Sequence, residues 1–314
     1  MNRLYFLVGI PGAGKSTYAQ RLIDNDPSIV WVSSDAIREE LWGDANDQQQ
    51  PGTVFGTMFQ RTAKALNAGQ DVIYDATNIN AKTRASTLMQ LRSYVSCEFE
   101  AVCVIVLCSL SECKRRQNDR DRKVPEECID RMVRQFQAPW YNEGWDRITT
   151  ADCGPKQDIA KEHIRMSRTP HDNPHHTSEN LNAHCLEAVA AYNTNADIYA
   201  QRGMVDILRE AAFQHDLGKY KTKAFRDSKG HPTDIAHYYS HDNVGAYLWL
   251  TGSEIWNWSE YDFLLIAVLI QWHMQPYFLE HDKSKLDKWC IKRNFGIPFS
   301  DWIWTIHQAD KAAH

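Results

Sequence analysis

A glycine-rich motif near the N-terminus constrains the fold of this chain more than any other feature. The apolar run LYFLV leads into GIPGAGKST, in which Gly9, Gly14, Lys15 and Ser16 satisfy the spacing GxxxxGK(S/T). This spacing places backbone N–H groups around phosphates, and glycine permits the tight curl because it has no Cβ. An apolar run before the motif and a helical pattern after it favour this interpretation over a chance glycine-rich turn. We therefore predict a strand, a phosphate-binding loop and a helix.

The same loop indicates which cofactors this region takes. A helix beginning near Lys15 would present unpaired N–H groups and the positive end of its dipole to the phosphates of a nucleotide. The lysine ammonium suits the phosphates and the hydroxyl of Ser16 suits magnesium. We expect ATP and Mg²⁺, bound by Gly12, Ala13, Gly14, Lys15, Ser16 and Thr17.

The length of the chain and the distribution of its histidines predict two domains. The chain has 314 residues, of which 43% are hydrophobic and 24% charged, as in ordinary soluble proteins. All 13 histidines lie at or after His163, which separates two halves of different chemistry. We expect a first domain over 1–150, a linker over 151–177 and a second domain over 178–314.

The remaining composition excludes several classes of protein. No run is apolar enough to span a membrane, and the N-terminus lacks a secretory signal, so we expect a cytoplasmic protein. The net charge of −5 argues against a broad grip on duplex nucleic acid, but it leaves recognition of a strand end open. The 8 cysteines include no CxxC pair, and Cys97, Cys103 and Cys108 lie in or beside apolar runs. They are typical of reduced core residues rather than disulfides or a zinc site.

An acidic and a basic residue follow a second short strand, predicted over 29–33. The segment SDAIREEL has a helix-start pattern, so Asp35 and Arg38 would lie one turn apart on one face. There the carboxylate is suited to act as a general base on an incoming hydroxyl while the guanidinium holds a phosphate. The alternative is a helix cap with a solvated ion pair, but the nearby phosphate loop favours the first interpretation.

A third strand and an arginine-rich helix add further candidates. The segment DVIYDATN places Asp75 at a strand end, where it would hold magnesium or its waters, an Asx turn being the alternative. After the apolar strand FEAVCVIVL, the predicted helix SECKRRQNDRDRK carries an arginine able to neutralise the γ phosphate, and we favour Arg120. Arg115 and Arg122 are as well explained by a solvated face.

Taken together, GIPGAGKST, SSDAIREEL, YDATN and RRQNDRDRKVP are similar in order and spacing to the phage-type polynucleotide 5′-kinase family, over about residues 1–140. The resemblance implies an α/β P-loop kinase domain with a parallel sheet and flanking helices. It also implies that Asp35 activates the 5′-hydroxyl, Arg38 holds the 3′ phosphate of the acceptor, and Arg120 contacts the γ phosphate. The segment between Arg120 and Pro125 is one residue shorter than in the family, which leaves Arg116 and Arg122 as alternatives.

The second half of the chain has a different pattern. The proline-rich segment 151–180 contains His171, His175 and His176, which we interpret as solvated rather than metal-binding. From residue 179 onward only helical patterns occur, and six histidines and aspartates set into them have the character of metal ligands. Imidazole and carboxylate groups suit first-row divalent metals, and the doublet HD places two ligands on one ion or lets the aspartate bridge two. The six are His184, His215, Asp216, His241, His273 and Asp310.

This pattern resembles the HD phosphohydrolase superfamily over about 178–314. The resemblance implies an all-α domain in which Mn²⁺, Ni²⁺ or Co²⁺ occupies one or two sites. His184, His215, Asp216 and Asp310 would hold the first metal, His241 and His273 the second, with Asp216 shared. Lys219, in HDLGK, would lie near the scissile phosphate, and His237 competes with His241 as a ligand. We expect four tryptophans of this half to pack between helices rather than bind nucleobases: Trp249, Trp272, Trp302 and Trp304.

The two resemblances together imply repair of broken nucleic-acid ends. One domain would phosphorylate a 5′-hydroxyl with ATP, and the other would remove a 2′,3′-cyclic, 2′ or 3′ phosphate. RNA or DNA strand ends are then the expected partners, with a ligase as a further candidate and no membrane. Two alternatives stay open: a salvage enzyme acting on nucleosides and nucleotides, and a cyclic-nucleotide phosphodiesterase regulated by ATP.

Overall fold

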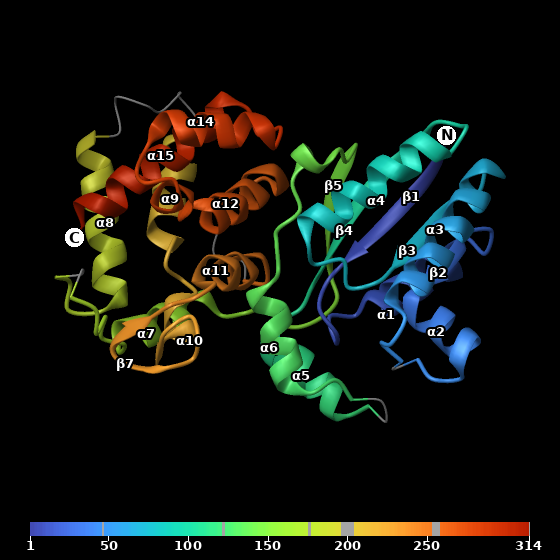
Figure 1. The fold of residues 1–314 in the computed structure, drawn as a ribbon, viewed down its shortest axis with the longest axis horizontal. Coiled ribbons are helices and arrows are strands. Elements are labelled where there is room, and N and C mark those ends of the chain that lie inside the picture. The colour runs from blue at the N-terminus through green and yellow to red at the C-terminus, as the bar shows by residue number, and fades with distance from the viewer. Residues whose placement is uncertain (46, 121–122, 175–176, 196–203, 253–257, 314) are drawn as a thin grey trace. The chain divides into compact units, whose positions relative to one another are not determined.

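The computed structural model describes residues 1–45, 47–120, 123–174, 177–195, 204–252 and 258–313 (Figure 1). It divides into two compact units, the first comprising residues 1–132 and 139–156 and the second residues 133–138 and 157–314. The predicted boundary at residue 150 falls within a strand, β5 (Arg147–Asp152), which belongs to the first unit.

A parallel five-stranded sheet forms the core of the first unit, in the order β2-β3-β1-β4-β5. Its longest strand is the apolar run FEAVCVIVL, which is buried almost throughout because helices cover both faces of a parallel sheet. Strand β5 was not predicted from the sequence, since RITTAD is polar and pairs with one neighbour at the edge. The other strands are β1 (Asn2–Val8), β2 (Val30–Ser33), β3 (Val72–Asp75) and β4 (Phe99–Leu107).

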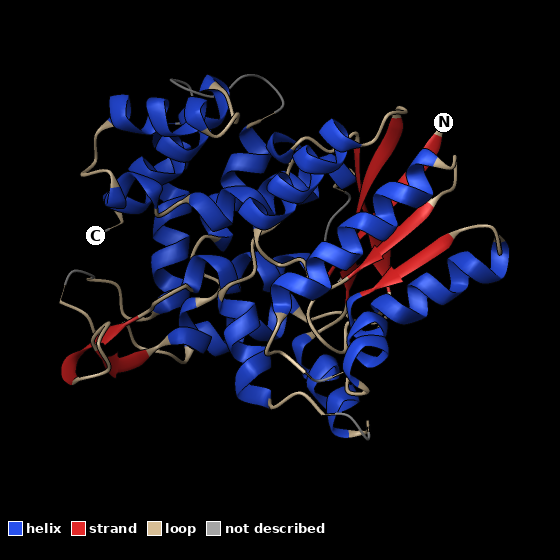
Figure 2. Cartoon of the chain, turned by 45° about the vertical axis from the view of Figure 1, so that its right-hand side comes forward, coloured by secondary structure: helices blue, strands red, loops and turns tan. Residues whose placement is uncertain are grey.

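Helices flank this sheet (Figure 2). They are α1 (Lys15–Asn25), α2 (Ser34–Trp42), α3 (Pro51–Asn67), α4 (Ala81–Tyr94), α5 (Leu110–Asn118), α6 (Glu126–Arg134) and the short 3₁₀ turn η1 (Tyr141–Glu143). The prediction that the arginine-rich helix runs to residue 123 is wrong, because α5 ends at Asn118. The run Asn-Asp-Arg-Asp, which begins with the last residue of α5, includes poor helix formers whose side chains compete for backbone hydrogen bonds.

One buried ion pair joins α4 to the segment around η1. The guanidinium of Arg84 donates to both carboxylate oxygens of Glu143, at 2.8 and 2.6 Å, and both side chains are almost fully buried. The indole of Trp145 donates a further hydrogen bond of 3.0 Å to Glu143. A buried charge pair is tolerated where its remaining polar atoms are bonded in this way.

The second unit is mainly helical (Figure 1). The helix α12 is apolar all round, and residues 264–271 are consecutively buried, as in a helix enclosed by others. The helices are α7 (Ile159–Ser167), α8 (Leu181–Asn195), α9 (Val205–Gln214), α10 (Lys219–Thr222), α11 (His241–Leu250), α12 (Glu260–Trp272), α13 (Gln275–Phe278), α14 (Lys283–Lys292) and α15 (Ile297–Ala312).

The expectation that this half contains no strand is wrong. An antiparallel hairpin, β6 (Ala224–Arg226) and β7 (Pro232–His237), precedes α11. The sequence DIAHYYSHDNVGAYLWL belongs to the region where only helical patterns are expected, but Ser240 takes a left-handed backbone conformation, with φ of 63°. A non-glycine residue at positive φ interrupts a right-handed helix, so α11 begins only at the next residue.

All eight cysteines are free thiols. Cys103 and Cys108 are buried as expected, whereas Cys97 is exposed. Among the described residues, no helix combines the length and the apolar character that crossing a bilayer requires.

Candidate functional sites

The glycine loop adopts a backbone that only glycine allows at two positions. Gly12 and Gly14 have φ values of 84° and 106°, in the left-handed region. A Cβ on Gly12 would also lie 2.4 Å from the carbonyl oxygen of Cys113, so a side chain there would force the loop to move. The helix α1 follows immediately, with Gly14 as its N-cap and no side-chain cap on its first N–H groups.

The loop lysine and serine lie against the end of β3. The Nζ of Lys15 donates to the carbonyl oxygens of Gly9 and Ile10 at 3.0 and 3.1 Å. The hydroxyl of Ser16 lies 3.4 Å from Oδ2 of Asp75, whose burial raises the pKa of that carboxyl group. Burial also lowers the pKa of Lys15, while Asp75 counteracts this effect. The structure thus brings together the three groups expected to hold the phosphates and magnesium.

Asp35 and Arg38 lie on one face of α2, as the sequence predicts. Nη1 of Arg38 donates to Oδ1 of Asp35 at 3.1 Å. The arginine is buried, whereas 56% of the aspartate side chain is exposed. Asp35 does not cap the helix, because the hydroxyl of Ser33 accepts the hydrogen bond from the backbone N–H of Ala36. The carboxylate is therefore oriented by the arginine and accessible from outside.

A single cavity of about 570 Å³ connects these groups. It is lined by the glycine loop, the Asp35–Arg38 pair, Asp75 and Arg120, so residues far apart in sequence face one space. Of the predicted nucleotide-binding residues, Ala13 and Thr17 do not line it. The lining residues used below are Gly12, Gly14, Lys15, Ser16, Asp35, Arg38, Asp75 and Arg120.

The four arginines of the α5 region have different surroundings. Arg116 donates to the carbonyl oxygens of Gly12 and Cys153, at 3.2 and 2.8 Å, and so fastens the loop. Arg115 is exposed and paired with acidic side chains of its own helix. Arg120 follows the end of α5 and lines the cavity. Arg122 lies outside the described residues.

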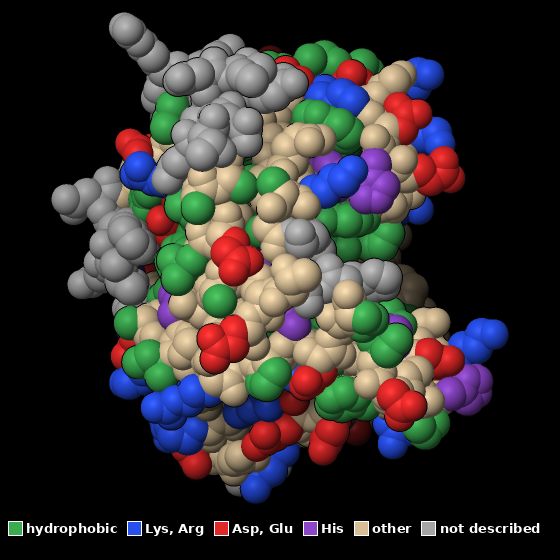
Figure 3. All heavy atoms as spheres, turned by 90° about the vertical axis from the view of Figure 1, so that its left-hand side faces the viewer, with side chains coloured by type: hydrophobic (Ala, Val, Ile, Leu, Met, Phe, Trp, Pro, Cys, Tyr) green, Lys and Arg blue, Asp and Glu red, His purple; other side chains and the backbone are tan. Residues whose placement is uncertain are grey.

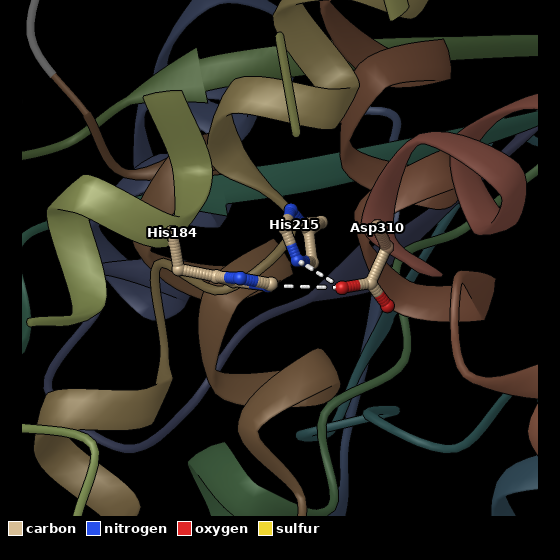
Figure 4. A group of neighbouring side chains, drawn as sticks. All are labelled: His184, His215 and Asp310. Carbon is tan, nitrogen blue, oxygen red and sulfur yellow. Dashed lines mark hydrogen bonds and ion pairs between the residues drawn. The ribbon is translucent and has the colours of Figure 1, made fainter. Parts of the chain in front are cut away.

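In the second unit, two groups of three buried side chains could each hold a metal ion. The first comprises His184 of α8, His215 after α9, and Asp310 of α15 (Figure 4). Oδ1 of Asp310 lies 2.9 Å from Nε2 of His184 and 3.3 Å from Nε2 of His215. Figure 4 shows both rings directed at this carboxylate.

The second group comprises Asp216, His241 of α11 and His273 after α12. Oδ1 of Asp216 lies 3.3 Å from Nε2 of His241 and 4.0 Å from that of His273. Oδ2 of the same residue lies 3.4 Å from Nε2 of His215, so Asp216 stands between the two groups. The structure therefore brings together all six side chains that the sequence marked.

The hydrogen bonds of these histidines fit metal ligation. Nδ1 of His215, His241 and His273 lies 2.7, 2.8 and 2.6 Å from a backbone carbonyl oxygen, which only accepts. Each Nδ1 must therefore carry a proton. In the neutral ring, Nε2 is then unprotonated and has a lone pair. Nε2 of His241 and Nε2 of His273 are only 3.1 Å apart. Two facing lone pairs repel each other, and a metal ion bound by both nitrogens would remove this repulsion. Metal-bound histidines commonly donate their other ring N–H to a backbone carbonyl, as Nδ1 does here.

The charges around Asp216 also fit a metal ion bound between these side chains. Burial opposes ionisation, but His215 and Lys219 outweigh it and hold the pKa of Asp216 well below its usual value. Nζ of Lys219 lies 2.6 Å from Oδ2 of Asp216. Burial likewise opposes the charged imidazole, yet Asp216 and Asp310 raise the pKa of His215 well above its usual value. Carboxylates that stabilise a positive charge on His215 in this way would also stabilise a metal cation beside them.

The sequence missed three residues around these groups. His171 is buried, contrary to the expectation that it is solvated, and its ring meets that of His184 edge to face at 5.2 Å. The hydroxyl of Tyr277 donates to Oδ2 of Asp310 at 2.8 Å, and Tyr238 packs beside Lys219. No local signal marks them, because each lies far in sequence from its partner. His175 and His176 lie outside the described residues.

The structure also shows the surroundings of the residues for which the sequence left two interpretations open. His237 stacks on Tyr239 and belongs to neither metal group, which leaves His241 as the ligand. Trp249 is buried in the helical core, and Trp272 packs against Trp289. Packing between helices is thus confirmed for these two tryptophans.

Similarity to known proteins concentrates in the first unit. Residues 4–139 match the family model described as an AAA domain. The L-seryl-tRNA(Sec) kinase of Methanococcus maripaludis is 28% identical over 150 residues, 46% of this chain and 56% of that protein. The chain therefore spans about half the length of this curated relative.

Two solved structures are similar to part of this chain. A chain of the Pnkp1/Rnl/Hen1 RNA repair complex is 23% identical, with a TM-score of 0.39 over 43% of each chain. A gluconokinase from Sinorhizobium meliloti 1021 is 15% identical, with a TM-score of 0.33 over 47% of this chain and 81% of that one. The region 4–139 therefore combines a glycine loop and a parallel sheet with the match to the family model described as an AAA domain.

Proposed function

We propose that this chain is a bifunctional nucleic-acid end-healing enzyme. Its first unit would transfer the γ phosphate of ATP to a 5′-hydroxyl. Its second unit would remove a 2′,3′-cyclic, 2′ or 3′ phosphate with the help of one or two divalent metals such as Mn²⁺, Ni²⁺ or Co²⁺. The products would be ends that a ligase joins.

The observation that carries the kinase proposal is the single cavity shared by the glycine loop and the Asp35–Arg38 pair. The loop, Lys15 and Ser16 would hold the phosphates of ATP and its Mg²⁺, with Asp75 beside the serine. Asp35, accessible and oriented by Arg38, would accept the proton of the attacking hydroxyl. Arg120, which lines the same cavity, would balance the charge of the transferring phosphoryl group.

The acceptor is proposed to be a strand end rather than a free nucleoside. Arg38 shares the cavity with Asp35, where its guanidinium would bind the 3′ phosphate that a nucleoside lacks. The name of the L-seryl-tRNA(Sec) kinase describes a hydroxyl carried on RNA, which supports an acceptor of this class.

The phosphohydrolase proposal rests on the inward-facing histidine lone pairs and the carboxylates between them. His184, His215, Asp216 and Asp310 would hold one ion, and His241 and His273 with Asp216 a second. A bound divalent ion polarises phosphoryl oxygens and lowers the pKa of a coordinated water. Lys219 would place its ammonium beside the same carboxylate, close enough to contact a substrate phosphate.

The test uses RNA with a 5′-hydroxyl and a 2′,3′-cyclic phosphate, incubated with ATP, Mg²⁺ and Mn²⁺. The phosphorylation state of the 5′ end and that of the 3′ end are both measured over time. We expect phosphate gain at the 5′ end and opening or loss of phosphate at the other. The variants Lys15→Ala and Asp216→Ala serve as matched controls, each removing one reaction. Equal activity on a free nucleoside would favour the salvage alternative, and hydrolysis without any phosphoryl transfer would favour the regulated phosphodiesterase.

A further inference from the structure

The hairpin between the two metal-ligand segments is basic in an acidic chain. Residues 220–240 contain four lysines and arginines, Lys221, Lys223, Arg226 and Lys229, but only two acidic residues, Asp227 and Asp234. The net charge of this segment is therefore +2, whereas that of the whole chain is −5. The hairpin projects from the helices of its unit (Figure 2). The face shown in Figure 3 carries basic and acidic side chains close together at its lower edge, so the surface of this acidic chain is mixed in charge there.

A flat aromatic surface lies on this hairpin. The rings of His237 and Tyr239 stack with centroids 5.3 Å apart and planes 6° from parallel. His237 ends the strand β7, and Ile235 precedes it on the same face, whereas Tyr239 lies in the turn that follows the strand. Tyr239 is 44% exposed and Ile235 is 40% exposed, which is unusual for large apolar side chains in one short segment. We call Ile235, His237 and Tyr239 the hairpin surface.

The residue between the two rings connects this surface to the metal ligands. The backbone carbonyl of Tyr238 accepts from Nδ1 of His241 at 2.8 Å. Nζ of Lys219 lies 5.3 Å from the centroid of the buried Tyr238 ring, and the Tyr238 hydroxyl donates to the carbonyl of His171. Tyr239 is only two residues from His241, so about 7 Å of chain separates the exposed ring from a metal ligand.

Exposed stacked aromatic rings beside cations are the features that bind single-stranded nucleic acid without regard to sequence. We propose that the hairpin surface, together with Arg226 of the paired strand β6, binds the nucleotides that precede a phosphorylated strand end. The bases would stack on Tyr239, and the backbone phosphates would pair with Arg226 while the terminal phosphate reaches the metal ligands. This inference rests on the proposed phosphohydrolase function, and it names a single strand as the substrate of that site.

Steady-state hydrolysis of a short single-stranded RNA with a 3′ phosphate, in Mn²⁺, tests the proposal with the full chain. Base stacking on an aromatic side chain contributes about 1–3 kcal/mol, which corresponds to about a 5- to 150-fold change. Tyr239→Ala is therefore expected to raise KM by that factor with little change in kcat, and Tyr239→Phe to retain the wild-type KM. Arg226→Ala is expected to reduce the slope of log kcat/KM against log salt by about 0.7.

The matched control is Tyr261→Ala, which removes a tyrosine of similar exposure, 47%, at the start of α12. The proposal is overturned if Tyr239→Ala and Tyr261→Ala have the same KM, or if Tyr239→Ala lowers kcat alone. If the wild-type chain hydrolyses no RNA, the proposed function fails, and photocrosslinking of an RNA with 4-thiouridine next to its 3′ end judges the surface separately. Crosslinks to residues 235–240 would support the proposal that this surface binds a strand. If that peptide carries no crosslink, the proposal is rejected.

Discussion

Arg116 and Arg120 lie one helical turn apart in sequence, yet their replacement by alanine should impair the protein in different ways. The guanidinium of Arg116 donates three hydrogen bonds: to Glu112 at 2.9 Å, to the carbonyl of Gly12 at 3.2 Å and to that of Cys153 at 2.8 Å. It therefore holds the glycine loop in position. Arg120 lies on the cavity wall, where its charge can meet the γ phosphate.

These contacts set the expected magnitudes. Hydrogen bonds to charged groups contribute about 1.5–3 kcal/mol each when buried, but the Arg116 side chain is 27% exposed and its bonds are not additive. We expect Arg116→Ala to lower the free energy of unfolding by about 2 kcal/mol and Tm by about 4–8 °C. Arg120→Ala should leave Tm unchanged and slow phosphoryl transfer by about 10³- to 10⁵-fold, or about 4–7 kcal/mol in the barrier.

Single-turnover phosphorylation of a 5′-hydroxyl oligonucleotide at saturating ATP measures the rate, while calorimetry and nucleotide titration measure Tm and ATP affinity. Arg115→Ala is the matched control, since its exposed ion pairs with Glu112 and Asp119 contribute little. The reasoning is refuted if Arg120→Ala transfers phosphate at the wild-type rate while Arg116→Ala, with unchanged Tm and ATP affinity, is slow. The arginine assignments of the lid would then be exchanged.

Four further changes test the remaining assignments. Asp35→Asn should retain ATP affinity but abolish transfer to a 5′-hydroxyl, since the carboxylate acts only on the acceptor; normal single-turnover rates would contradict this. Asp216→Ala should abolish hydrolysis and Lys15→Ala should abolish kinase activity, each sparing the other reaction; loss of both activities in either folded variant would mean one composite site. Arg84→Met should lower the free energy of unfolding by about 3–5 kcal/mol because Glu143 stays buried, and Arg84→Met/Glu143→Leu should recover most of it; a urea midpoint near wild type for the single variant would reject that role. Removing metal with a chelator should lower the Tm of the second unit, and an unchanged Tm would argue against bound metal.

The sequence predicted the first unit well because its signals are local. A glycine loop between an apolar strand and a helix occupies only a few consecutive residues, and the strand at Phe99–Leu107 is continuously apolar. The strand β5 and the hairpin were missed because they are short, polar and lie at an edge or apart from the main sheet. Neither has the apolar alternation that marks a half-buried strand.

Contacts between distant residues were beyond prediction. Arg116 bonds to carbonyl groups 104 and 37 residues away, and nothing in RRQNDR indicates which arginine fastens the loop and which lines the cavity. The same holds for Tyr277, whose partner Asp310 lies 33 residues further along the chain. Such roles follow from the packing of elements and not from spacing within one element.

Three of the candidate ligand histidines share one local hydrogen-bond arrangement that the sequence alone did not reveal. Nδ1 of His215, His241 and His273 bonds in each case to the carbonyl three residues earlier, in Ala212, Tyr238 and Ile270. Two of these histidines are the C-caps of α9 and α12, where the last carbonyl groups of a helix lack partners within it. A histidine at that position satisfies an unpaired carbonyl and, because its Nδ1 is then protonated, turns its Nε2 lone pair away from the helix.

His237 and His281 lack this arrangement, since their Nδ1 atoms face a tyrosine hydroxyl and another imidazole. For His215 and His273, the helix end distinguishes the candidate ligand from these two histidines, as in AAFQHD and LIQWHM, where an apolar helix stops at the histidine. The three Nδ1–carbonyl bonds leave the Nε2 atoms of His215, His241 and His273 to face Asp216, and protonation at Nδ1 makes each of these Nε2 atoms an acceptor. Backbone hydrogen bonding thus prepares these three histidines for the metal ligation that the proposed phosphohydrolase activity requires.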